Sequence, residues 1–211
     1  MATGPRERSR GLPLMSGIRL IAGLGNVGAE YDDTRHNAGF WFLDALASAH
    51  GASFSRQSKF FGDVARINAG GEAVYLVKPT TFMNRSGQAV AALAGFYRIA
   101  PEAVLVVHDE LDLLPGIAKL KQGGGHAGHN GLKDITARLG SAAFWRMRIG
   151  IGHPRTLELE QAVIDFVLHR PSRDDRALID QAIDAGLDCI PDMLAGRIEQ
   201  AMKRLHTQPK A

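Results

Sequence analysis

Short apolar stretches that alternate with helical stretches constrain the fold of this chain most strongly. The turn signal at residues 68–71 joins two of the apolar stretches as a hairpin, and Pro191 is expected to kink or divide the last helix. Strands are predicted over Ile18–Gly23, 60–67, 73–77, 103–107, 117–121 and 144–151, and helices over 40–49, 86–97, 132–139, 159–168 and 172–206. The alternation predicts a single α/β domain with a mixed, mostly parallel central sheet flanked by helices.

The composition fits one globular domain of this kind. The chain has 211 residues, of which 45% are hydrophobic, and a formal charge of +3. No apolar run approaches the roughly 20 residues of a membrane span, and the single cysteine, Cys189, fits a reducing compartment. We expect a disordered basic extension over residues 1–16, a domain over residues 17–207 and a flexible tail over residues 208–211. Because no signal-peptide pattern is present, a cytoplasmic location is expected.

The charges are distributed unevenly along the chain. Residues 115–155 hold seven lysines and arginines against one acidic residue, whereas residues 158–192 hold nine carboxylates and three arginines. A basic block followed by an acidic block indicates a surface that faces a polyanion. Ion pairs between the two blocks are an equally acceptable interpretation at this point.

Gly23, Gly25 and Gly28 follow the first predicted strand with the spacing G-x-G-x-x-G, which is typical of a dinucleotide-binding turn. Such a turn needs a helix that starts at the third glycine and an acidic residue about 20 positions further on. Here the chain stays polar and aperiodic until Phe40, and the nearest acidic candidate, Asp44, lies inside a predicted helix. The glycine pattern therefore does not predict a nicotinamide or flavin site.

Polar side chains recur where predicted strands end or helices begin. Each has an ordinary structural interpretation: Asn84 and Asn130 as helix N-caps, Asp109 as a cap or a partner of a lysine, and His36 as a surface imidazole. Together they supply a base, a carboxylate to orient it and neutral amides on one side of the sheet, which suits acyl transfer to water without a covalent intermediate. The set consists of Asn26, His36, Asn84, Asp109 and Asn130.

Other chemistries find less support in the sequence. Cys189 is far from the histidines, and no G-x-S-x-G motif is present. The stretches 108–110 and 126–129 are rich in possible metal ligands, but no H-E-x-x-H motif occurs and a glycine-rich loop holds two histidines poorly. The glycines at 123–125 lack the ending of a phosphate-binding P-loop. We therefore expect no metal site and no nucleotide site.

Several long motifs in the chain match one family in order. They are GLGNVGAEYDDTRHNAGFWFLDALA, KPTTFMNRSGQAV, VVHDELDLLPGIAKLKQGGGHAGHNGLKDI and FWRMRIGIGHP. From about residue 18 to residue 206 the sequence resembles the bacterial-type peptidyl-tRNA hydrolases. This resemblance implies a usually monomeric α/β domain with a mixed, twisted sheet. It also implies hydrolysis of the ester between a peptide and the 3′-terminal ribose of tRNA, with no metal or organic cofactor.

The resemblance also implies a role for each site residue. His36 would activate water as general base, Asp109 would hold its tautomer, and Asn84 would bond the peptide backbone or the developing oxyanion. Asn26 and Asn130 would position the scissile ester with its ribose or water. Tyr31 and Met83 would line the cleft and His129 would contact the substrate, while Lys121 and Arg148 would hold the tRNA 5′-phosphate beside the acceptor stem and the 3′ CCA end.

The sequence departs from the family pattern in three places. Val27 stands where the family usually has proline, the loop 141–143 is shorter by a residue, and the segment 154–162 carries Glu158 and Glu160 near the expected path of the acceptor stem. The main competing hypothesis is a non-catalytic, RNA-binding relative of the same fold. Such a protein would be expected to have lost members of the polar set, and all five are present here.

Overall fold

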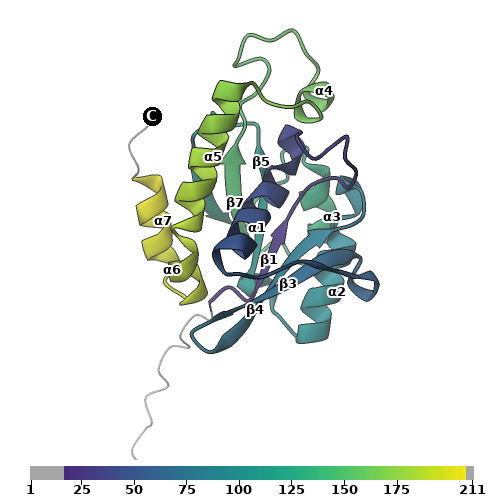
Figure 1. The fold of residues 1–211 in the computed structure, drawn as a ribbon, viewed down its shortest axis with the longest axis vertical. Coiled ribbons are helices and arrows are strands. Elements are labelled where there is room, and N and C mark those ends of the chain that lie inside the picture. Colours follow the sequence, from purple (N-terminus) through teal and green to yellow (C-terminus); the bar gives the residue numbers. More distant parts are fainter. Residues whose placement is uncertain (1–16, 208–211) are drawn as a thin grey trace, which may run out of the picture.

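The computed structural model describes residues 17–207; the predicted basic extension and tail lie outside the described residues. A seven-stranded sheet with the order β2-β3-β4-β1-β5-β7-β6 forms the centre of the molecule (Figure 1). The strands are β1 (Leu20–Gly23), β2 (Ser55–Gln57), β3 (Gly62–Ala69), β4 (Glu72–Pro79), β5 (Val104–Glu110), β6 (Ala118–Gln122) and β7 (Trp145–Gly150). The four central strands β4, β1, β5 and β7 are parallel, while β2, β3 and β6 pair antiparallel at the edges. The predicted mixed α/β sheet is confirmed.

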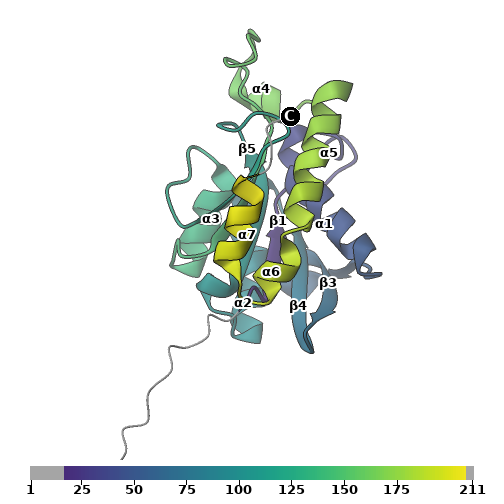
Figure 2. The ribbon, with the colours of Figure 1, turned by 90° about the vertical axis from the view of Figure 1, so that its left-hand side faces the viewer.

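Helices cover both faces of this sheet. On one face, α1 (Ala38–Ala49), α5 (Arg173–Leu187), α6 (Ile190–Leu194) and α7 (Ile198–His206) enclose the larger core. On the other face, α2 (Gly87–Tyr97) and α3 (Asn130–Leu139) enclose a second core. Figure 2 shows α2 and α3 on one side of the sheet and α1 and α5 on the other. The short α4 (Val163–Val167) stands above the ends of the central strands (Figure 1).

The glycines of the G-x-G-x-x-G stretch serve close packing and a turn. A Cβ on Gly23 would lie 2.3 Å from the carbonyl oxygen of Gly39, and one on Gly25 would lie 2.8 Å from the ring of Phe40. Gly28 has a φ of +122°, which L-residues rarely adopt. The first two glycines therefore let α1 approach the end of β1, and the third allows the chain to turn toward the loop that carries His36.

The C-terminal third differs from the predicted helices. Only Val163–Val167 of the predicted helix 159–168 is helical, because Glu158 takes a positive φ of 56° and Ala162 is still extended. The predicted helix 172–206 consists of α5, α6 and α7. Pro191 lies in the first turn of α6, where its missing N–H costs nothing, and Gly196 with a φ of +76° separates α6 from α7. Among the described residues, no helix is long and apolar enough to cross a membrane.

Candidate active site

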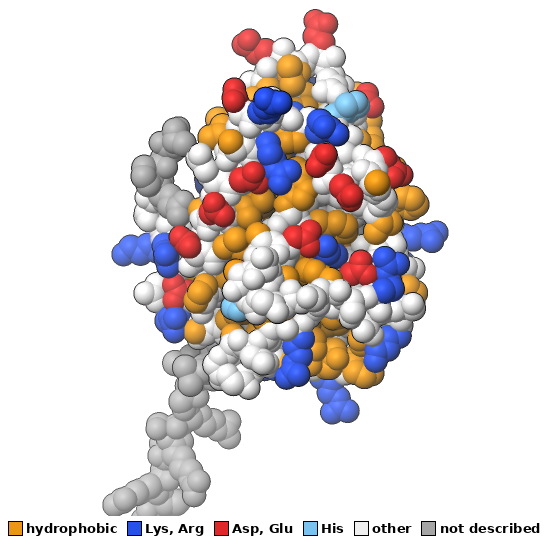
Figure 3. Space-filling view, in the orientation of Figure 1, with side chains coloured by type: hydrophobic (Ala, Val, Ile, Leu, Met, Phe, Trp, Pro, Cys, Tyr) orange, Lys and Arg blue, Asp and Glu red, His pale blue; other side chains and the backbone are white. Residues whose placement is uncertain are grey.

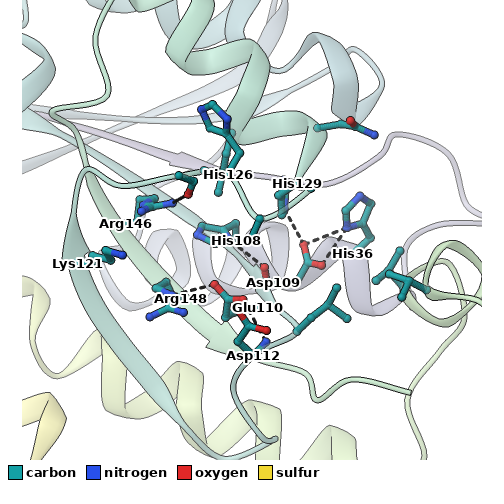
Figure 4. Close-up of a pocket in the computed structure, with 18 of the residues that line it drawn as sticks. His36, His108, Asp109, Glu110, Asp112, Lys121, His126, His129, Arg146 and Arg148 are labelled. Carbon is teal, nitrogen blue, oxygen red and sulfur yellow. Dashed lines mark hydrogen bonds and ion pairs between the residues drawn. The ribbon is translucent and has the colours of Figure 1, made fainter. Parts of the chain in front are cut away.

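A cavity of about 550 Å³ opens where the central strands end. Its wall combines residues of η1 (Arg35–Asn37), the end of β5, the facing sides of β6 and β7, the glycine-rich loop 123–129 and α4. The polar lining residues are His36, His108, Asp109, Glu110, Asp112, Lys121, His126, His129, Asn130, Arg146 and Arg148. Figure 4 shows His36 and His129 with Asp109 at one end of this cavity, the cations Lys121, Arg146 and Arg148 at the other, and His108 between them.

His36 and Asp109 form a direct pair. The imidazole Nδ1 lies 3.0 Å from both carboxylate oxygens of Asp109. The neutral imidazole that donates its Nδ1–H to this carboxylate leaves Nε2 as a free base. Burial lowers the pKa of His36, but the charge of Asp109 and the hydrogen bond to it outweigh this effect, so the pKa lies above its ordinary value. The pair is suited to accept a proton and to stabilise the imidazolium that results.

His129 contacts the same carboxylate from the other side. Its Nε2 lies 3.1 Å from Oδ1 of Asp109, and the rings of His36 and His129 are 5.2 Å apart, centroid to centroid. Asp109 is only 4% exposed, and this burial raises its pKa, but the neighbouring imidazoles outweigh the burial and hold that pKa well below its usual range. Asp109 therefore stays ionised between the two imidazoles, as Figure 4 illustrates.

His108 is a third, fully buried imidazole beside this pair. Its Nδ1 lies 2.7 Å from the backbone carbonyl oxygen of Asp109, and its ring lies 5.0 Å from that of His129. Burial, reinforced by the neighbouring His129, lowers the pKa of His108 to about 3. It is therefore neutral and donates its Nδ1–H to that carbonyl, which fixes the backbone next to the Asp109 side chain.

Four cations lie opposite one another across β6 and β7, and three of them, Lys121, Arg146 and Arg148, line the cavity. Lys119 lies opposite Arg148 in the strand register, and Lys121 lies opposite Arg146. Like charges directly opposite one another destabilise a sheet, and only part of this charge is neutralised: Arg148 pairs with Glu110 at 2.8 Å. A site of this kind favours a bound anion.

Arg146 anchors the glycine-rich loop beside these cations. Its guanidinium donates to the carbonyl oxygens of Gly123 and Gly125, the latter at 2.8 Å. A Cβ on Gly124 would come within 2.9 Å of Lys121, so the loop closes tightly against both cations. The loop that leads to His129 and Asn130 is therefore fixed from the strand that also carries Arg148.

The amide side chains are distributed more widely. Asn26 is buried, and its Oδ1 accepts the backbone N–H of Met83 at 2.8 Å. Asn37 holds Asn26 in turn, because its side chain accepts the backbone N–H of Asn26 and donates to its carbonyl. Met83 is buried, with Sδ close to Gly131 at the start of α3. Asn26 thus ties the loop after β1 to the loop after β4.

The cavity does not bring all the expected site residues together. His36, Asp109, His129, Asn130, Lys121 and Arg148 line it, whereas Asn26, Asn84, Tyr31 and Met83 are not among its lining residues. Asn84 is exposed in η3 (Met83–Arg85), and Tyr31 packs edge-on against Phe82 with a centroid distance of 6.5 Å. These residues lie on the loops after β1 and β4.

The simpler interpretations of the polar residues are not borne out by the structure. Asn84 and Asn130 do not cap a helix through their side chains, since the caps of η3, α2 and α3 are Phe82, Ser86 and His129. Asp109 lies inside β5, which extends to Glu110, and its partners are histidines rather than a lysine. Within residues 17–207, no ion pair joins the basic block 115–155 to the acidic block 158–192.

His36, Asp109 and His129 are also the residues with the geometry to hold a metal ion. One ligand atom from each lies within 4.8 Å of the others. In the present arrangement, both imidazoles contact the carboxylate directly at hydrogen-bond distance. The same three groups thus form a hydrogen-bonded unit around Asp109, and their chemistry is that of a histidine base with its carboxylate.

Some residues that shape the site were missed in the sequence. Asn37 follows His36 directly, but nothing in its sequence context shows that it grips Asn26 across the loop. Arg146 had a usable signal: the patterns K-x-K at 119–121 and R-x-R at 146–148 place all four cations on one face of neighbouring strands. His108 was considered only as a metal ligand, because sequence does not show that it is buried.

Comparison with known proteins identifies the family of this chain. The family model described as "Peptidyl-tRNA hydrolase" matches residues 20–211. A "Peptidyl-tRNA hydrolase" of Bordetella petrii is 62% identical over 197 residues, covering 93% of this chain and 94% of that protein. The chain belongs to the peptidyl-tRNA hydrolase family. The resemblance found in the sequence motifs, and the hydrolase class that it implied, are thereby confirmed.

Solved structures of peptidyl-tRNA hydrolases show the same fold. A crystal structure of the enzyme from Acinetobacter baumannii has a TM-score of 0.88 and 47% sequence identity, and covers 93% of this chain and 98% of that chain. A complex of peptidyl-tRNA hydrolase with N-propanol has the same TM-score and 46% identity over the same shares. The seven-stranded mixed sheet is therefore the fold of this family.

Proposed function

We propose that this protein hydrolyses the ester bond of peptidyl-tRNA with His36 as the general base. One observation carries the mechanism: Nδ1 of His36 is held 3.0 Å from the carboxylate of Asp109, which leaves Nε2 available to a water molecule in the cavity. With an ordinary pKa near 6.5, an imidazole is matched to this task around neutral pH.

The reaction requires only groups of the protein, water and the substrate. Nε2 of His36 takes a proton from water while the oxygen attacks the ester carbonyl, and the negative charge passes to the carbonyl oxygen. When the tetrahedral intermediate collapses, the bond to the ribose 3′ oxygen breaks and the imidazolium returns the proton to that oxygen. Asp109 stabilises the imidazolium between the two steps, because it faces Nδ1 as a buried carboxylate.

The amide residues position the substrate in this proposal. Asn130 lines the cavity at the start of α3, next to His129, where it bonds the terminal ribose or the water. Asn26 orients the scissile ester from the loop after β1, and Asn84 bonds the peptide backbone or the developing oxyanion. Tyr31 and Met83 line the cleft beside these loops and contact the peptide. The protein acts in this scheme as a monomer without a metal or organic cofactor.

Lys121 and Arg148 hold the 5′-phosphate of the tRNA in this proposal. Both line the cavity end opposite His36, within the row of four cations on β6 and β7. Cations at a phosphate provide affinity without reading sequence, which suits a hydrolase of many tRNAs. Removal of the phosphate from the tRNA should weaken binding more in the wild type than in the Lys121→Ala variant, which keeps only Arg148 at the phosphate. Equal weakening of both proteins would contradict this assignment.

The proposed function is tested with N-acetyl-aminoacyl-tRNA as substrate. Release of the N-acetyl-amino acid by the wild-type protein, with deacylated tRNA as the second product, is the expected result. Retained tRNA binding without any release would contradict the proposal and would favour the non-catalytic RNA-binding relative.

Lys121→Ala should reduce the slope of log affinity against log salt concentration by about 1, as expected for one lost phosphate contact.

A further inference from the structure

Arg35 is buried directly before His36 in the chain, and it is not among the residues that line the cavity. Its Nη1 donates to the backbone carbonyl oxygens of Phe166, His169 and Arg170 at 3.1–3.2 Å. Its guanidinium carbon lies 4.0 Å from the centre of the Phe166 ring. The side chain of Arg35 therefore contacts the end of α4 and the residues that connect α4 to α5.

The backbone carbonyl oxygens at the end of α4 and just after it can accept further hydrogen bonds from a cation. The last carbonyl groups of a helix have no partner within the helix and form the negative end of its dipole. The guanidinium of Arg35 satisfies carbonyls there and also lies 3.8 Å from Asp175 in the first turn of α5. The backbone N–H of Arg35 donates to His169 as well, at 3.2 Å. A lysine has one terminal nitrogen and no planar group, so it cannot contact these carbonyls through one nitrogen, face Asp175 through a second and lie flat on the Phe166 ring.

The helix that Arg35 holds forms one wall of the cavity. Val163, Ile164 and Val167 of α4 line the cavity, and Ile164 is 59% exposed. In Figure 1, α4 stands apart from the helical layers, above the end of β5. The neighbouring tip of the molecule, residues 152–162, rises beyond it and carries acidic side chains at the top of Figure 3. Phe166 and Val167 of α4 are buried in the larger core, and Arg35 adds buried polar contacts to this packing through the carbonyl oxygens of residues 166, 169 and 170.

We infer that Arg35 is a positioning residue that fixes the apolar wall of α4 at a set distance from His36. This inference rests on the proposed function. In it, the wall formed by α4 holds the esterified end of the substrate next to His36, and Arg35 holds that wall in place. Arg35 belongs to the same η1 turn as His36. This short segment therefore carries both the base and the side chain that binds the end of α4. Loss of this contact weakens substrate binding, while the His36–Asp109 pair stays intact.

The test compares Arg35→Lys with the wild type on N-acetyl-aminoacyl-tRNA. A several-fold rise in KM is expected, with kcat at saturating substrate within twofold of the wild type and an unchanged pH dependence of kcat. Arg170→Gln is the matched control, because it removes a cation from the same segment whose partner, Asp33, is exposed. An unchanged KM, or a kcat that falls while KM stays constant, would overturn the inference.

A double-mutant cycle shows whether Arg35 acts through α4. Ile164→Ala removes an exposed side chain of the α4 wall, and its effect on KM should largely disappear in the Arg35→Lys background. Full additivity of the two effects would overturn the inference.

If Arg35→Lys does not fold, Asp175→Asn replaces it as the test variant. Faster amide exchange of residues 163–167 together with a raised KM is then expected, and unchanged exchange refutes the inference. Absence of turnover in the wild type refutes the proposed function instead.

Discussion

Replacing Asp109 with asparagine tests the pairing at the centre of the site. The substitution keeps the shape of the side chain and removes the charge that faces Nδ1 of His36 at 3.0 Å. A hydrogen bond to a charged group contributes about 1.5–3 kcal/mol, which corresponds to about 10- to 150-fold in rate. The new NH₂ group also donates to Nδ1 and favours the tautomer with the proton on Nε2. The total loss in kcat/KM should therefore fall within the range of about 10²–10⁴-fold for a general base.

The pH dependence of the same variant provides a second readout. In the wild type, kcat/KM should decline as the pH falls through the pKa of His36, which Asp109 raises above its ordinary value. Without Asp109, burial alone acts on the imidazole and lowers that pKa, so the acid limb should move to lower pH. Asp63→Asn, which removes an equal charge on β3 from a pair with the exposed Arg56 of β2, is the control. A loss of less than about threefold, or an acid limb that does not move, would refute the pairing.

Two further predictions concern stability. His108, with a pKa of about 3, stays neutral when folded but binds a proton when unfolded below its ordinary pKa, so the stability that it supports is lost as the pH falls through that window. Between pH 7 and pH 4.5, the wild type should lose about 2–3 kcal/mol more unfolding free energy in urea than His108→Gln; parallel losses would contradict this. Gly39→Ala places a Cβ 2.3 Å from the backbone nitrogen of Leu24 and should cost about 3 kcal/mol or more. Gly95→Ala, with open space around it on α2, should be neutral or slightly stabilising in the same thermal unfolding assay, and equal effects of the two substitutions would refute the packing argument.

The strands and most helices were predictable because their apolar periodicity is local. The α1 and α2 segments start within two residues of the predicted positions, and β1 and β7 lie inside the predicted ranges. The segment 159–168 was predicted only in part, since its helix is confined to Val163–Val167 and the residues before it include a positive φ at Glu158 that the sequence did not reveal. Pro191 was recognised as a break, but a second break at Gly196 requires a left-handed backbone that the sequence alone did not reveal.

The site was predictable in its residue types and only partly in its contacts. Polar residues at strand ends led to His36 and Asp109, and the structure brings them into direct contact. The sharing of Asp109 with His129, and the burial of His108 behind both, depend on how the glycine-rich loop returns over β5. That return is fixed by Arg146 from a distant strand, a contact that no local pattern encodes.

The measurement that tests the account most directly is the hydrolysis of N-acetyl-aminoacyl-tRNA by the wild type and by His36→Ala, each with and without EDTA. Turnover by the wild type should resist EDTA, and His36→Ala should be slower by about 10²–10⁴-fold while it still binds tRNA. A variant that retains turnover close to that of the wild type, or a wild type that loses its activity with EDTA, would contradict water activation by His36.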